Sequence, residues 1–229
     1  MIARLRDHWQ LAALTVLVLV LWPFAITTPL KILVIFFHEA AHGLAAILTG
    51  GRIEEISVSL AQGGHAVTIG GSPFLIISAG YLGSLLIGAT LFLVALRSRF
   101  DRAVLALLGA LLILLVVLYI RELFPAAFAI ATGAIFLAMA RYLRPEIADM
   151  TLRVIGLTSM IYVPLDIFDD TLARPGVRSD ARILAENFGG PAMVWGAIWL
   201  VIALAVIYLT LRYGIRQPSN IQLRRAPAP

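Results

Sequence analysis

Hydrophobic residues form seven long stretches along the chain, each bounded by charged residues, glycine or proline. They cover residues 11–26, 30–48, 73–96, 103–120, 123–140, 147–172 and 191–211. About 20 apolar residues are enough for a helix to cross the hydrocarbon core of a bilayer. The pattern therefore predicts an all-α polytopic membrane protein with about seven transmembrane helices. Pro23 predicts a kink in the first of them.

Residues 52–71 break this helical pattern. Two short runs rich in isoleucine and valine are separated by Gly63-Gly64 and end at Gly70-Gly71. Such a pattern predicts two strands joined by a tight turn. Non-helical backbone at membrane depth is tolerated only where protein buries it or where it lines a wet cavity. We therefore expect a short re-entrant β-hairpin that forms one wall of a cavity.

The composition agrees with a membrane protein. Of the 229 residues, 61% are hydrophobic and 14% are charged, whereas soluble domains are 45–50% apolar and about 25% charged. The predicted organisation is one transmembrane domain over residues 1–211 and a basic, disordered tail over 212–229. The net charge of +5 comes from arginines that flank the apolar stretches, as expected beside membrane spans, so no nucleic-acid partner is predicted. The absence of cysteine excludes disulfides and thiolate metal ligands.

The second apolar stretch contains the sequence His38-Glu39-Ala40-Ala41-His42. Two histidines four residues apart lie on one helix face, so both rings can bind one zinc ion. In this pattern the glutamate acts as a general base beside the open ligand position. Histidines hydrogen-bonded within a bundle are the alternative, but three ionisable groups inside a membrane-length stretch are costly unless compensated. The stretch therefore predicts a metal site.

A third ligand must come from elsewhere in the chain. Asp166, Asp169 and Asp170 interrupt the sixth apolar stretch and share one helix face, because they are three and four residues apart. The second and sixth stretches cross the membrane in the same direction, so both polar clusters reach a similar depth. Asp166 is the predicted third ligand, since it is the deepest and follows Pro164. Asp169 and Asp170 stay open as alternatives, with a solvated helix end as the competing explanation for both.

Together these features resemble the site-2 protease family of intramembrane zinc metalloproteases, and within it a small, PDZ-less, M50B-like branch. The resemblance covers about residues 32–200. Besides the two histidines, it includes the hairpin, the element Gly80-x-x-x-Ser84, the aspartate cluster at 166–170 and the following Ser179-Asp180-Ala181. Ser179 or Asp180 is also the predicted N-cap of a short helix.

The resemblance implies that His38, His42 and one downstream aspartate bind a single Zn²⁺ and that Glu39 activates water. It implies hydrolysis of a peptide bond in or near a transmembrane segment of a membrane-protein substrate. One departure is that isoleucine follows Asp166, where the family pairs the ligand aspartate with glycine.

The hairpin is the predicted substrate-binding element, because an extended substrate can pair with an exposed strand. Gly64, His65 and Val67 are the candidate contact residues. A surface histidine in a turn is the alternative for His65.

The predicted location is the bacterial cell membrane. Lysine and arginine counts mildly favour an outside N-terminus, whereas the family arrangement places the active site near the cytosolic side; we adopt the family arrangement.

Two other functions compete with the protease: a catalytically silent membrane chaperone or assembly factor, and a metal-ion or proton transporter. The intact histidine motif argues against the first. The absence of repeated interrupted helices argues against the second.

Overall fold

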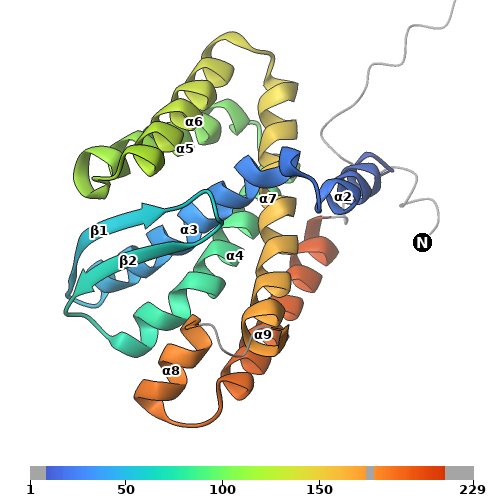
Figure 1. The fold of residues 1–229 in the computed structure, drawn as a ribbon. Coiled ribbons are helices and arrows are strands. Elements are labelled where there is room, and N and C mark those ends of the chain that lie inside the picture. The colour runs from blue at the N-terminus through green and yellow to red at the C-terminus, as the bar shows by residue number, and fades with distance from the viewer. Residues whose placement is uncertain (1–8, 174–177, 215–229) are drawn as a thin grey trace, which may run out of the picture.

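The computed structural model describes residues 9–173 and 178–214, which form a bundle of helices with one two-stranded hairpin (Figure 1). The elements in chain order are α2 (Trp9–Leu21), η1 (Ala25–Thr27), α3 (Thr28–Leu48), β1 (Arg52–Val58), β2 (Gly64–Ile69), α4 (Pro73–Arg97), α5 (Asp101–Tyr119), α6 (Leu123–Tyr142), α7 (Pro145–Phe168), η2 (Asp169–Ala173), α8 (Asp180–Phe188) and α9 (Ala192–Gly214).

The all-α membrane class with about seven helices is confirmed, and the first of them is shorter than a full span. In the described part of the chain, six helices are long and apolar enough to cross a membrane. The first predicted span is shorter: α2 has 13 residues, or about 20 Å, against about 30 Å of hydrocarbon. The predicted kink at Pro23 is instead the end of α2. A turn and the 3₁₀ segment η1 separate it from α3.

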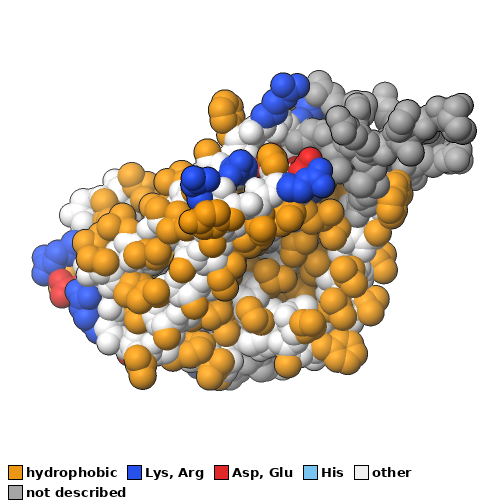
Figure 2. All heavy atoms as spheres, turned by 90° about the horizontal axis from the view of Figure 1, so that it is seen from above, with side chains coloured by type: hydrophobic (Ala, Val, Ile, Leu, Met, Phe, Trp, Pro, Cys, Tyr) orange, Lys and Arg blue, Asp and Glu red, His pale blue; other side chains and the backbone are white. Residues whose placement is uncertain are grey.

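Three of the long helices form the inside of the bundle. More than half of the apolar part of α3, α4 and α7 is buried, whereas less than a third is buried in α5, α6 and α9. Small residues allow this close packing: Gly83 lies against Ala41 of α3, and Gly88 lies against Ser159 of α7. In Figure 2, hydrophobic side chains cover much of the visible surface, and the Lys and Arg side chains gather in a few groups. An apolar outer surface of this kind suits contact with lipid.

The β-hairpin is confirmed within a few residues of its predicted bounds. β1 and β2 pair antiparallel, with a bulge between Ile53 and Glu55. Ile56 and Val58 are buried in the same core cluster as the inward face of α3, and both strands pack along that helix (Figure 1). Ser57 donates a hydrogen bond to Glu122, at 2.8 Å, and so ties the hairpin to the turn between α5 and α6. The hairpin is therefore held beside α3.

The end of α7 brings the last part of the chain back to the hairpin side of the bundle. Pro164 lies inside α7, which continues to Phe168 and then passes into the π-helical turn η2. The predicted short helix is confirmed as α8, with Ser179 as its N-cap residue. α9 reaches Gly214, so the first residues of the predicted tail are helical. The rest of that tail, 215–229, lies outside the described residues.

Candidate metal centre

Two histidines face the interior from the same side of α3. His38 and His42 are one helical turn apart, and their ring centroids are 4.7 Å apart. His42 is buried, and the helix around both residues is apolar and mostly buried. The predicted juxtaposition of the two rings is therefore present.

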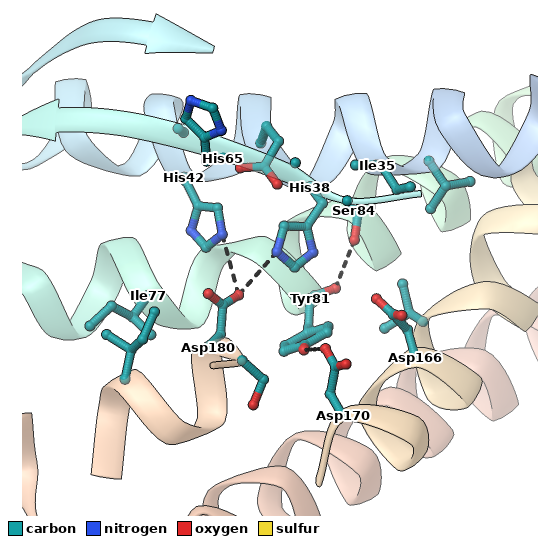
Figure 3. A pocket seen from close by; sticks show the side chains of 18 of the residues that line it. Ile35, His38, His42, His65, Ile77, Tyr81, Ser84, Asp166, Asp170 and Asp180 are labelled. Carbon is teal, nitrogen blue, oxygen red and sulfur yellow. Dashed lines mark hydrogen bonds and ion pairs between the residues drawn. The ribbon is translucent and has the colours of Figure 1, made fainter. Parts of the chain in front are cut away.

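The carboxylate that joins them is Asp180, the first residue of α8. Its Oδ2 atom lies 3.0 Å from Nε2 of His38 and 3.2 Å from Nε2 of His42. Figure 3 shows the three side chains pointing toward one another from α3 and α8. Two imidazole nitrogens and one carboxylate oxygen thus converge within the reach of a single ion.

The structure groups a different carboxylate with the two histidines from the predicted third ligand, Asp166. Asp166 lines the same cavity, but its carboxylate is not grouped with the two histidine rings. Asp170 also lines the cavity and accepts a hydrogen bond from Tyr81, whereas Asp169 is not among the residues that line it. Depth along α7 does not point to Asp180, because α8 folds back and places this closer carboxylate beside the histidines.

The hydrogen bond of His42 fixes which ring nitrogen faces Asp180. Nδ1 of His42 lies 2.6 Å from the carbonyl oxygen of Ile76. A carbonyl oxygen can only accept, so Nδ1 carries the proton, and Nε2 of the neutral ring presents a lone pair. Oδ2 of Asp180 is buried and has no hydrogen-bond partner among the described residues. A cation between the Nε2 and Oδ2 atoms would be bound by both lone pairs. The hydrogen bond from Nδ1 to the Ile76 carbonyl is also usual for a metal-binding histidine, which donates its other N–H to a neighbouring acceptor.

The ionisation of Asp180 agrees with a ligand role. Burial opposes its charged form, but the short contacts of Oδ2 with the His42 and His38 rings outweigh burial and lower the pKa of Asp180 below its ordinary value. The carboxylate is therefore ionised at neutral pH, as a metal ligand must be.

Glu39 lies next to the histidines and is 5% exposed. It lines a cavity of about 590 Å³ whose walls include His38, His42 and Asp180. A Cβ atom at Gly64, the first residue of β2, would lie 2.5 Å from Oε1 of Glu39. A larger residue at this point would displace the Glu39 side chain, so the hairpin closes directly over the carboxylate that the sequence identifies as the base.

Gly80 of α4 lies directly beside both histidine rings. A Cβ atom there would overlap Nε2 of both His38 and His42. The space between α3 and α4 is therefore kept open where an ion bound to both rings would need it.

The hairpin residues occupy different positions relative to this cavity. Gly64 and His65 belong to β2 rather than to the turn, and both line the cavity. The His65 ring points away from Asp180 (Figure 3), and its nitrogen lies near the carboxylates of Glu55 and Glu122. Val67 is exposed on β2 and pairs with Glu55. His65 is thus at the edge of the cavity and not beside the converging nitrogens.

Sequence reasoning missed Asp180 as the closest carboxylate. Ser179-Asp180-Ala181 was noted, but a serine-aspartate pair at the start of a helix has a sufficient explanation as a cap. The feature that separates Asp180 from an ordinary cap residue is its buried Oδ2 atom, and this burial is visible only in three dimensions.

Six membrane-length helices that enclose a His–His–carboxylate group define an integral membrane protein with a candidate metal centre inside its bundle. Within that class the chain belongs to the Peptidase M50B-like family, whose sequence model matches residues 11–210. The expected relationship to the M50 peptidases is confirmed by this match. No curated protein and no solved structure matches the chain.

Proposed function

We propose that the protein is an intramembrane zinc endopeptidase in which His38, His42 and Asp180 hold the ion. The observation that carries this proposal is the convergence of two Nε2 atoms on one buried carboxylate oxygen at 3.0 and 3.2 Å. The donor set suits Zn²⁺, which binds histidine and aspartate and keeps one position open in catalytic sites. Membership in a peptidase family supports the same reaction.

Glu39 is the proposed general base. Zinc, when bound, supplies a Lewis acid that lowers the pKa of water and polarises a carbonyl group. The carboxylate of Glu39 follows His38 directly and lines the same cavity. From there it can accept a proton from the attacking water and return that proton to the leaving amine. Its burial under Gly64 keeps it in this position.

The substrate is a peptide segment in or beside the membrane. Most of the chain consists of helices of membrane length, and the cavity lies among α3, α4, α7 and the hairpin. A helical segment hides its carbonyl groups in intrahelical hydrogen bonds, so it must be unwound before cleavage. β1 contacts α5 and α6, whereas β2 contacts only β1 and α3 among the described elements. We propose that β2 receives the unwound segment by strand addition.

A proline at Val67 is expected to impair cleavage of a helical substrate more than cleavage of an already unwound one. Proline removes a backbone donor and disfavours strand pairing. The measurement compares initial cleavage rates of a transmembrane substrate with and without helix-breaking residues near the scissile bond. Val67→Ala is the matched control, because it shortens the side chain and keeps the backbone N–H. Equal losses on both substrates would argue against strand addition.

We propose that the metal centre faces the cytosol, following the family arrangement. The chain has no cysteine, so single cysteines can report on each end of the bundle. Arg52 follows the end of α3 and Tyr142 ends α6, three spans further on, and both side chains are exposed. An impermeant maleimide should label Tyr142→Cys in intact cells and Arg52→Cys only after the membrane is opened. The reverse labelling pattern would place the metal centre on the outside.

A further inference from the structure

The two histidine rings are held by different kinds of contact. His42 donates from Nδ1 to the carbonyl oxygen of Ile76, at 2.6 Å. For His38 the structure shows an aromatic contact instead: the Tyr81 ring meets it edge to face, with centroids 4.9 Å apart and planes at 85°. Rotation of the His38 ring changes the direction in which its Nε2 lone pair points. A side chain that holds this ring in place therefore also fixes that direction.

Tyr81 is itself held on several sides. It is 2% exposed, and its ring also packs against Trp199 of α9, with centroids 5.3 Å apart. Its hydroxyl donates a hydrogen bond to Oδ2 of Asp170, at 2.6 Å (Figure 3). Asp170 lies in η2, the π-helical turn that ends α7. Isolated π-helical turns often occur at functional sites. The ring that packs on His38 is thus anchored to a different helix from the one that carries it.

We propose that Tyr81, held by Asp170, is a positioning residue that orients His38 for metal binding, an inference that rests on the proposed zinc function. The hydrogen bond keeps the Tyr81 ring from rotating, and the ring in turn keeps His38 aimed at Asp180. This gives Asp170 a role other than the direct ligation that its sequence position suggested. Groups that orient metal ligands typically contribute 10–100-fold to metal affinity or activity.

Tyr81→Phe tests the hydroxyl, because phenylalanine keeps the ring between His38 and Trp199 and removes only the bond to Asp170. Asp170→Asn tests the other partner with little change in shape. Each variant should weaken zinc binding about tenfold, as measured by competition with a chelator of known affinity. The double variant should bind zinc no more weakly than either single variant, because one interaction is lost in all three.

Ser159→Ala is the matched control for general loosening of the bundle. Ser159 is fully buried on α7 and donates a hydrogen bond to the carbonyl oxygen of Ser84 on α4, at 2.8 Å. This variant also removes one bond between α4 and α7, but Ser159 is not among the residues that line the cavity. It should lower the unfolding temperature of the metal-free protein and leave zinc affinity unchanged. The visible spectrum of bound Co²⁺ should shift in the Tyr81 and Asp170 variants and not in this control.

Three results would overturn the role of Tyr81. Unchanged zinc affinity and Co²⁺ spectra in Tyr81→Phe and Asp170→Asn would overturn it while leaving the zinc site of the wild-type protein intact. Additive losses in the double variant would show that the two residues act separately. Wild-type protein that binds no zinc would overturn both this inference and the proposed function, so the two failures are distinguishable.

Discussion

Replacing Glu39 with glutamine is expected to abolish peptide cleavage while zinc remains bound. Glutamine has nearly the same shape, so it fits under Gly64, but its amide cannot accept a proton from water. Loss of a positioned general base typically lowers the rate by about 10²–10⁴-fold. The proposed ligands His38, His42 and Asp180 are untouched by this change, so metal content should match that of the wild type.

The experiment compares membrane-protein fragments in cells that carry wild-type protein or Glu39→Gln, together with the zinc content of each purified protein. Glu146→Gln is the matched control. Its carboxylate is exposed at the start of α7, away from the metal centre, where it pairs with Arg144. This control should keep full activity. Cleavage by Glu39→Gln at the wild-type rate would refute the assignment of Glu39 as the base.

The sequence predicts the long helices well because each must be apolar over its whole length to cross a bilayer. The hairpin is equally visible, since Gly63-Gly64 and Gly70-Gly71 bound its second strand. The first helix is shorter than its apolar stretch for a local reason. Apolar residues continue past Pro23, but α2 ends before it, and hydrophobicity alone does not show where a helix stops.

The candidate site also has one part that the sequence predicts and one part that it does not. His38 and His42 lie one turn apart on a single helix, so their proximity follows from helix geometry alone. Asp180 reaches them only because α7 ends, the chain turns back and α8 packs against α4. Tyr81 is similar: its contact with His38 depends on how closely α3 and α4 approach. Contacts set by tertiary packing leave no periodic signal in the sequence.

Replacing Asp180 with asparagine is expected to remove most of the bound zinc, whereas the substitution Asp166→Asn should leave the zinc in place. Asp180 supplies the only carboxylate oxygen grouped with the two histidine nitrogens among the described residues. Its loss leaves two ligands where catalytic zinc normally has three. The decrease in affinity should therefore exceed the 10–100-fold typical of losing a group that only orients a ligand. Cleavage should be lost together with the metal.

Stability measurements separate loss of the metal from loss of the fold. A carboxylate in the first turn of a helix stabilises it by about 0.3–1 kcal/mol, so Asp180→Asn should destabilise the metal-free protein only slightly. Zinc should raise the unfolding temperature of the wild type and of Asp166→Asn, because a ligand that binds only the folded state stabilises it. It should not raise that of Asp180→Asn. If Asp166→Asn instead loses zinc while Asp180→Asn keeps it, the third ligand belongs to α7, and the close approach of Asp180 to the histidines serves only to hold α8 against α3.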